Sequence, residues 1–230
     1  MLKKFAPYLI ASSLVAVNLV GFADTADSNN SQMFIEVGPG LSQVQTDIAQ
    51  TLGATTVSTT DSSSYWGWHA GMGGIYHYRA LGFGGELRYN AYAPYTQSFT
   101  GTLGAETANI TAQYQTSSLS MLSLAQYYFN PTFKITGIAG LAYVLQKLNF
   151  TVSDSGIPSS SFSLNNNHVA PVLGLGLGYD ITTHIGVAAD IDYIFGTKPQ
   201  VSDTSDINYI NNYNSDAPIA SANLSLIYSF

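Results

Sequence analysis

The sequence predicts an all-β protein, an eight-stranded antiparallel transmembrane β-barrel with four long extracellular loops and short periplasmic turns. Three observations predict this class. Apolar and polar residues alternate through eight segments with the period of a two-faced strand. Only 9% of the 230 residues are charged, and 13% are aromatic. Beyond the N-terminal segment the longest nearly apolar run, 135–145, has 11 residues, whereas a spanning helix needs about 20.

Residues 1–23 are interpreted as a secretory signal peptide. Two lysines precede a short apolar stretch, and small residues, Gly21 and Ala23, occupy the two positions that a signal peptidase reads. A single N-terminal membrane anchor is the alternative, disfavoured by the short apolar core. Without this segment five basic and 14 acidic residues remain, a net charge of −9, which argues against nucleic acid as a partner. Residues 24–32 are predicted to form a polar periplasmic lead. Residues 33–230 are predicted to form the barrel domain.

The first half of the barrel domain is predicted to hold four strands. They cover residues 33–41, 66–78, 81–92 and 117–129. Two residues between the second and third strands make a hairpin. A second tight turn is expected at 130–132, where Pro131 cannot donate to a ladder. The alternation is weakest in 117–129, because Leu122 and Leu124 lie opposite the other apolar residues.

The second half is predicted to hold four more strands, with a short turn around Thr182 and Thr183. The strands cover residues 133–145, 168–179, 185–195 and 220–230. Polar stretches rich in Ser, Thr and Asn join strands at the opposite end and are expected to be exposed loops. They cover residues 42–64, 93–115, 147–167 and 196–217. Because such barrels have short turns inside and long loops outside, these loops are expected to face out of the cell.

The face opposite the apolar one carries charges and many glycines. The alternative is a soluble sandwich or lipocalin-like barrel, which would turn its apolar face inward. The face described here is too polar, and its side chains are too small, to form the core of a soluble protein. The inward face is therefore predicted to line a narrow lumen. Six charged residues fall on it: Glu36, Glu86, Arg88, Lys134, Asp190 and Asp192.

Arg88 is expected to cross the lumen to an acid. Glu86 and Arg88 lie at the same number of residues from their turn as Asp190 and Asp192 do from theirs. The two strands are four apart in the barrel, so the two pairs are expected at similar depth on opposite walls. Eight strands leave interior space mainly for side chains. Interior packing that satisfies buried charges is therefore favoured, and a gated narrow pore is the alternative.

Aromatic residues mark both ends of the strands. Tyr and Trp prefer the two membrane interfaces, so two belts are predicted. The loop-end belt contains Trp66, Trp68, Tyr143 and Tyr193, and the turn-end belt contains Tyr76, Tyr78 and Tyr228.

The last strand reads ASANLSLIYSF, with its large apolar residues on one face. These are Leu224, Leu226, Tyr228 and Phe230. An alternating strand that ends on a C-terminal Phe resembles the last strand of bacterial outer-membrane barrels. This resemblance implies that the barrel-assembly machinery recognises it.

The chain as a whole resembles the transmembrane domain of OmpA-type, OmpX-type and Opa-like proteins. The shared features are the signal peptide, the eight strands, the four long loops, the Gly-rich inner face, the inward Glu86 and Arg88, and the terminal aromatic residue. The resemblance implies a bacterial outer-membrane location, contact with outer-membrane lipid and lipopolysaccharide, and an interior charge network. The peptidoglycan-binding domain of full-length OmpA proteins has no counterpart, so cell-wall anchoring is not implied.

The sequence predicts no catalytic, cofactor or metal site. Lipid A deacylases use a His and a Ser two residues apart, and none of the four His has such a Ser. The acidic fourth loop lacks the glycine and spacing of a calcium loop. Two functions remain. One is a non-enzymatic surface barrel, structural or adhesin-like, whose loops contact host or environmental ligands. The other is a small narrow channel for ions or apolar solutes.

Overall fold

The computed structural model describes residues 31–44, 46–52, 55–61, 64–103, 106–154, 160–196 and 218–230. Strands make up nearly all of this part of the chain, and it holds no helix able to cross a membrane. The strands are β1 (Ser31–Val44), β2 (Thr46–Leu52), β3 (Thr55–Asp61), β4 (Ser64–Tyr78), β5 (Leu81–Tyr92), β6 (Tyr95–Leu103), β7 (Glu106–Tyr128), β8 (Phe133–Asp154), β9 (Ser160–Asp180), β10 (Ile185–Ile194) and β11 (Ile219–Ser229).

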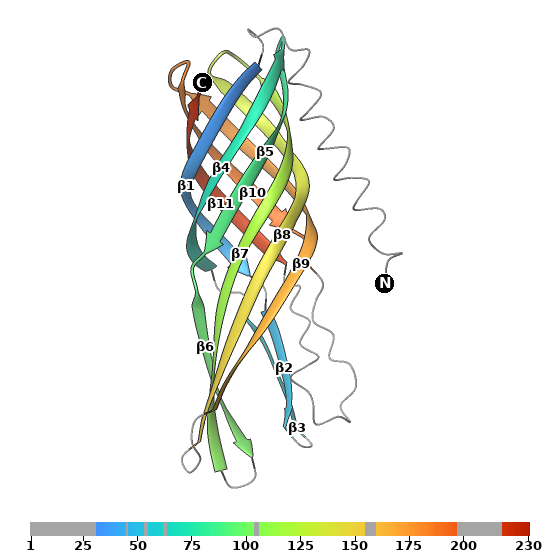
Figure 1. Ribbon diagram of the computed structural model, residues 1–230, viewed down its shortest axis with the longest axis vertical. Coiled ribbons are helices and arrows are strands. Elements are labelled where there is room, and N and C mark those ends of the chain that lie inside the picture. The colour runs from blue at the N-terminus through green and yellow to red at the C-terminus, as the bar shows by residue number, and fades with distance from the viewer. Residues whose placement is uncertain are drawn as a thin grey trace, which may run out of the picture.

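Eight strands close into an antiparallel barrel (Figure 1). Their order is β5, β4, β1, β11, β10, β9, β8 and β7, and β7 pairs back with β5. The first and last barrel strands therefore lie side by side, with Val37 opposite Leu226. A closed sheet leaves no backbone edge unpaired within hydrocarbon. The predicted eight-stranded antiparallel barrel is confirmed.

Three tight turns join barrel strands at one end, as predicted. Arg79 and Ala80 join β4 to β5, and Arg79 adopts a left-handed φ of 58°. In the turn before β8, Asn130 Oδ1 accepts hydrogen bonds from the backbone N–H groups of Thr132 and Phe133 at 3.0 and 2.8 Å. In the turn before β10, Thr182 Oγ1 accepts hydrogen bonds from the backbone N–H groups of His184 and Ile185. These side chains satisfy backbone donors that the ladders leave free.

Three of the four predicted loops are largely strands instead. The first contains the β2–β3 hairpin, the second contains β6 and the start of β7, and the third forms the outer parts of β8 and β9. Polar strands beyond the lipid need no apolar alternation, so the sequence pattern gave no strand signal there, although threonine favours strands. Residues 197–217 of the fourth loop lie outside the described residues, as do residues 1–30, including the expected signal peptide.

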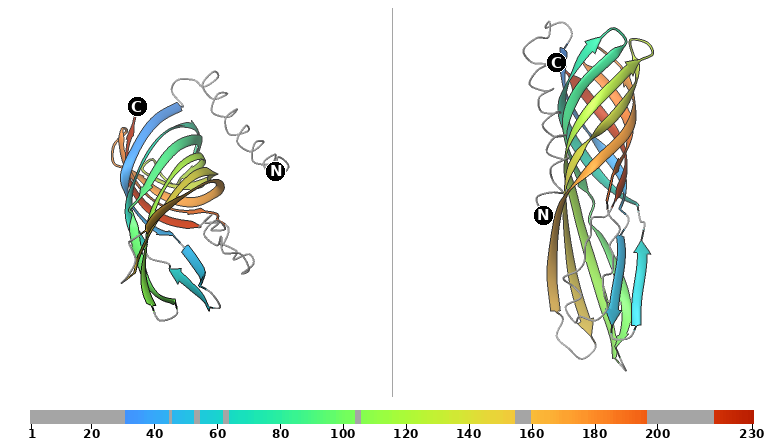
Figure 2. Two further views of the ribbon diagram at one scale, coloured as in Figure 1. Left: turned by 60° about the horizontal axis from the view of Figure 1, so that its bottom comes forward. Right: turned by 90° about the vertical axis from the view of Figure 1, so that its right-hand side faces the viewer.

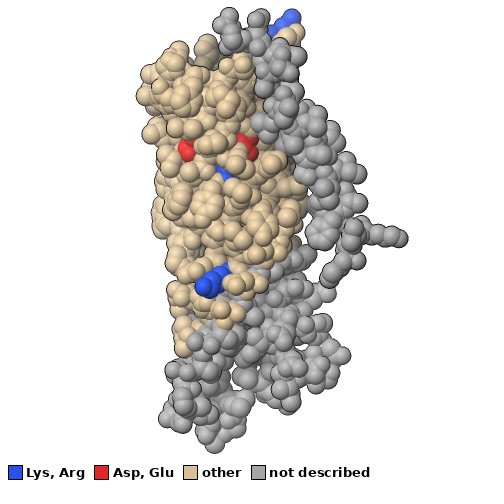
Figure 3. All heavy atoms as spheres, in the orientation of Figure 1, with Lys and Arg blue, Asp and Glu red and all other residues tan. Residues whose placement is uncertain are grey.

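The barrel has an apolar outside and a mixed inside. Trp66 is 69% exposed and Leu175 is 59% exposed on the outer wall, whereas Glu86 and Arg88 are buried inside. The visible barrel wall carries only isolated charged atoms (Figure 3). β1 begins at Ser31, so the last two residues of the expected periplasmic lead belong to the barrel.

The interior also contains a row of buried apolar side chains near the loop end of the barrel. Val44, Ile219, Ile194 and Val172 lie next to one another across four strands and are all buried. This row lies on the loop side of Asp192, which is two residues before Ile194. Buried apolar side chains thus share the lumen with the charges, and Leu122 lies directly across from Glu86.

Candidate functional site

Arg88 bridges opposite walls of the barrel. On its own strand β5, Arg88 Nε donates to Glu86 Oε1 at 2.6 Å and Nη2 donates to Glu86 Oε2 at 3.1 Å. Across the lumen on β10, Nη1 donates to Asp190 Oδ1 at 2.9 Å and to Asp192 Oδ2 at 3.4 Å. The guanidinium fork presents several donors in a fixed plane, which allows one side chain to bind both walls.

Glu36 on β1 joins the same cluster, and polar neighbours surround it. Its Oε1 lies 3.1 Å from Arg88 Nε and 3.7 Å from His69 Nε2. His69 Nε2 also lies 2.8 Å from Ser225 Oγ. The amide of Asn223 donates to Asp190 Oδ1 at 3.0 Å and to Asp192 Oδ2 at 2.8 Å. Four carboxyl groups thus face one guanidinium in a buried space.

A glycine lies directly across a strand pair from every predicted interior charge. The pairs are Glu36–Gly71, Arg88–Gly71, Glu86–Gly73, Asp190–Gly176, Asp192–Gly174 and Lys134–Gly178. The clearest case is Gly71, where an added Cβ would lie 2.5 Å from Glu86 Oε1 and 3.0 Å from Glu36 Cγ. The glycines therefore make room for long charged side chains in a lumen that is only wide enough for packing.

Lys134 lies inside the barrel but outside the Arg88 cluster. Its Nζ donates to Asp180 Oδ1 and Oδ2 at 2.8 and 3.1 Å, close to the turn end of the barrel. It also lies 5.5 Å from the centre of the Tyr128 ring. The structure brings the other five predicted interior charges together and sets Lys134 apart with a partner, Asp180, that was not among the predicted site residues.

The space left inside is small. A lumen cavity of about 50 Å³ lies between Arg88 and Lys134. Such a volume has room for a few water molecules. Arg88 blocks the middle of the lumen, and the apolar row that contains Ile219 lies on its loop side. In the described residues the lumen is therefore filled chiefly by side chains.

The predicted aromatic belts and the last strand have outward side chains. Of the belt residues, Trp66, Trp68, Tyr78, Tyr143, Tyr193 and Tyr228 are exposed and Tyr76 is half-buried. Leu224, Leu226 and Phe230 are also exposed, at 57%, 55% and 67%. Tyr228 and Phe230 contact each other edge to face at 5.1 Å. These positions agree with contact with lipid along the whole final strand.

Sequence reasoning did not select His69, Asn223, Ser225 or Asp180 as site residues. The alternation of their strands placed the first three on the inner face, which was the available signal. Asp180 ends β9 on the same inward register as Gly178. What the alternation does not give is which inward groups touch, because that depends on the stagger between neighbouring strands.

The polar groups of this site lie in the barrel interior. Within the described residues no group of three or more His, Asp or Glu side chains is placed to hold a metal ion. His69 and Ser225 are in contact, but both are buried inside the wall at 1% exposure.

Comparison with known proteins gives a family match and several similar folds. A family model described as an outer membrane protein beta-barrel domain matches residues 13–230. Ail, the attachment invasion locus protein of Yersinia pestis, has 16% identity and a TM-score of 0.47, covering 87% of this chain and 99% of that one. The N-terminal barrel domain of Pseudomonas aeruginosa OprF has 15% identity and a TM-score of 0.42, with 87% and 98% coverage. Neisserial surface protein A has 13% identity and a TM-score of 0.40, with 86% and 97% coverage. No curated protein matches this chain.

Proposed function

The chain belongs to the outer membrane protein beta-barrel domain family, and we propose that it is a non-enzymatic surface barrel whose extracellular sheet binds a host or environmental ligand. Family membership confirms the resemblance drawn from the sequence and places the chain in the bacterial outer membrane. The finer role, a structural or adhesin-like one, depends on the part of the molecule outside the lipid.

The observation that carries this proposal is the length of three neighbouring strands. β7, β8 and β9 have 23, 22 and 21 residues, whereas a tilted strand crosses a membrane with about 9–11. β10 and β11, with 10 and 11 residues, have that spanning length. The excess projects as a sheet beyond the barrel, joined by β6 (Figure 2).

The projecting sheet has an unprotected edge. Among the described residues β6 pairs only with β7, and its sequence YTQSFTGTL contains neither a charge nor a proline. Proteins usually protect an exposed edge with such residues, because its free backbone groups pair with another chain. An extended polypeptide that adds to this edge would gain main-chain hydrogen bonds. We infer that the ligand is bound by strand addition to β6.

The test removes this sheet edge and leaves the barrel in place. β6 pairs with the start of β7 from Tyr95–Tyr114 to Leu103–Glu106, and residues 95–114 are replaced by Asn-Gly. The matched control removes the β2–β3 hairpin, residues 46–61, which belongs to a different sheet. Adhesion of bacteria to epithelial monolayers and survival in serum are then measured.

We expect the first deletion to abolish adhesion or serum survival and the second to preserve it. Folding of each barrel is checked by electrophoresis of unboiled samples. Wild-type adhesion and serum survival in a folded protein that lacks residues 95–114 would overturn the proposal.

The alternative function is a small narrow channel for ions or apolar solutes. The filled lumen supports packing rather than conduction, since Arg88 contacts Glu86 and Asp190 on opposite walls. Single-channel current from refolded protein in a planar bilayer tests it. Reproducible current steps that change with Arg88→Ala would favour the channel, and a silent bilayer would favour the surface role.

The proposal includes two kinds of contact besides the surface ligand. The exposed outer wall supports contact with outer-membrane lipid and lipopolysaccharide. The exposed face of β11, ending at Phe230, supports recognition of the final strand by the barrel-assembly machinery. Neither kind of contact needs the lumen, so both are compatible with a closed interior.

A further inference from the structure

The strand β6, whose outer edge is free, has a sequence that is complementary to itself. When YTQSFTGTL lies antiparallel to a second copy with Phe99 opposite Phe99, all nine residues of the strand have a partner. Tyr95 of one copy then lies opposite Leu103 of the other, and Ser98 lies opposite Thr100. The strand contains no charged residue, so no like charges meet in this pairing. Two copies of β6 can therefore form a symmetric pair without charge repulsion between the strands.

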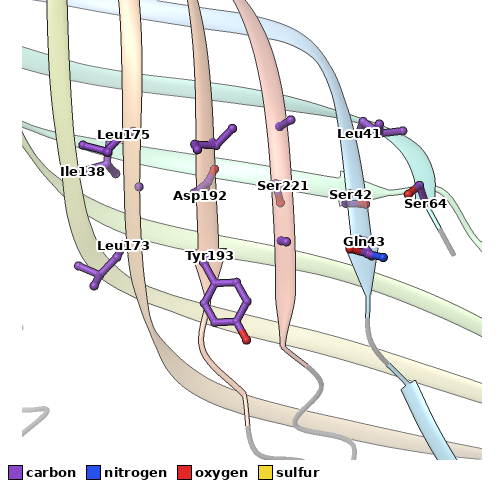
Figure 4. A pocket seen from close by; sticks show the side chains of 14 residues that line it. Leu41, Ser42, Gln43, Ser64, Ile138, Leu173, Leu175, Asp192, Tyr193 and Ser221 are labelled. Carbon is purple, nitrogen blue, oxygen red and sulfur yellow. The ribbon is translucent and has the colours of Figure 1, made fainter. Parts of the chain in front are cut away.

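The edge of β6 stands clear of the barrel wall beside it. β4 begins at Ser64, β1 ends at Val44 and β10 ends at Ile194, so this part of the wall ends at the barrel rim. Figure 4 shows the rim, with Ser64, Gln43 and Tyr193 beside the strand ends. The β2–β3 hairpin forms a sheet of its own, and within the described residues no strand is paired with the outer edge of β6. The backbone groups of this edge are thus available to another chain.

The direction of β6 determines where the second copy lies. The strand runs away from the barrel (Figure 1), from Tyr95 near the rim to Leu103 at the far hairpin, where Leu103 pairs with Glu106. Antiparallel pairing therefore places the two barrels at opposite ends of the joint sheet. Barrels in one membrane all send β6 outward in the same direction, so an antiparallel pair requires two membranes that face each other.

We propose that β6 pairs with β6 of a second copy of this chain on a neighbouring cell, and so joins bacteria to one another. The inference goes beyond the proposed function, because the partner is another copy rather than a host or environmental ligand, but it rests on the same free edge. One pair of strands is a small interface, and many copies on two cell surfaces add their contributions. At about 3.4 Å per strand residue, the pair would hold the two barrel rims roughly 30 Å apart.

A pair within one membrane fits this edge less well. Two such copies would present β6 in parallel, and a two-fold axis along the strands would join the outer face of one sheet to the inner face of the other. These faces differ: Thr96 and Ser98 are exposed on the outer face, whereas Tyr114, on the neighbouring strand β7, is buried on the inner face. The antiparallel pair keeps each face continuous, because its two-fold axis is perpendicular to the sheet.

The test places charges at two positions that face each other in the proposed pair. The lysine variant, Ser98→Lys with Thr100→Lys, sets each new lysine opposite a lysine of the second copy. The glutamate variant, Ser98→Glu with Thr100→Glu, does the same with acids. The matched control, Ser98→Lys with Thr100→Glu, sets opposite charges face to face in two identical copies.

Each full-length protein is expressed in bacteria with truncated surface polysaccharide, so that two outer membranes can approach each other. Clumping is measured by the rate of settling, and in mixtures by two fluorescent labels. Electrophoresis of unboiled samples confirms that each variant is folded. Adhesion of the same cells to epithelial monolayers is measured separately.

We expect wild-type cells and control cells to clump, and cells with the lysine or the glutamate variant to lose clumping, because like charges directly opposite each other destabilise a strand pair. A one-to-one mixture of lysine-variant and glutamate-variant cells should clump again, with both labels in each clump. The proposal is overturned if wild-type cells clump no more than cells without the protein, if either like-charged variant clumps alone, or if the mixture stays dispersed.

The two readouts separate this inference from the proposed function. Wild-type cells that adhere to epithelial monolayers but do not clump would overturn self-pairing alone. Wild-type cells that clump but do not adhere and do not survive in serum would support self-pairing and overturn the role in ligand binding.

Discussion

The two ion-pair clusters of the lumen differ in solvent exposure and in the balance of acidic and basic groups. Around Arg88, one guanidinium faces four carboxyl groups; the side chains of Arg88, Glu86, Glu36 and Asp190 are no more than 5% exposed and that of Asp192 is 9% exposed. Near the turn end, Lys134 faces one acid, Asp180, and their side chains are 10% and 28% exposed. Both clusters are built from the same chemistry on the same inner face.

From this difference we expect solvent exposure to decide how much each interior ion pair contributes to stability. A buried charge that loses its partner cannot be hydrated, so the central cluster depends on Arg88. At the turn end of the lumen, water is closer and can hydrate a group that loses its partner. The Lys134–Asp180 pair is therefore expected to contribute less to the free energy of unfolding. Three predictions test this contrast, in order of decreasing effect.

Replacing the central cation should have the largest effect. Arg88→Met keeps an unbranched side chain but leaves four carboxyl groups facing one another without a guanidinium. We expect the free energy of unfolding to fall by about 3–5 kcal/mol, the usual cost of breaking a buried ion pair. Urea unfolding in lipid vesicles, followed by the fluorescence of Trp66 and Trp68, measures it.

The matched control removes an acid from the same cluster. Glu36→Gln preserves shape and lowers the excess of acids over cations, so its unfolding free energy should stay within about 0.5 kcal/mol of wild type or rise. If Glu36→Gln loses as much stability as Arg88→Met, lost contacts rather than unbalanced charge dominate, and the contrast between centre and turn end fails.

The glycine opposite the central cluster should give an intermediate effect. In Gly71→Ala the new Cβ would lie 2.5 Å from Glu86 Oε1, so we expect a loss of about 1–3 kcal/mol from overpacking. In Gly137→Ala the nearest atom would be the carbonyl oxygen of Ala125 at 3.7 Å, and little change is expected. Urea unfolding compares the two. Equal losses would show that strand propensity, rather than space for the charges, explains the glycines.

Much of this molecule could be predicted from alternation alone. The period of two assigned the correct face to Glu86, Arg88 and Asp190, because a strand has only two faces and one of them meets lipid. Strand stagger then determined which inward groups touch, and this separated Lys134 from Arg88. The projecting sheet was missed for a related reason: beyond the lipid both faces meet water, so no alternation marks residues 95–114 as strand.

Disrupting the ion pair at the turn end of the lumen should have the smallest effect on stability. Lys134→Met and Asp180→Asn, alone and combined, form a double-mutant cycle that isolates the pair from the packing of each side chain. We expect a coupling energy of about 0.2–1 kcal/mol, because Asp180 is 28% exposed and lies at the turn end of the lumen, where water is close. The same cycle on Arg88→Met and Asp190→Asn should give a larger value, since neither group there can be hydrated. A coupling at Lys134–Asp180 equal to that at Arg88–Asp190 would mean that the turn end of the lumen is as dry as its centre.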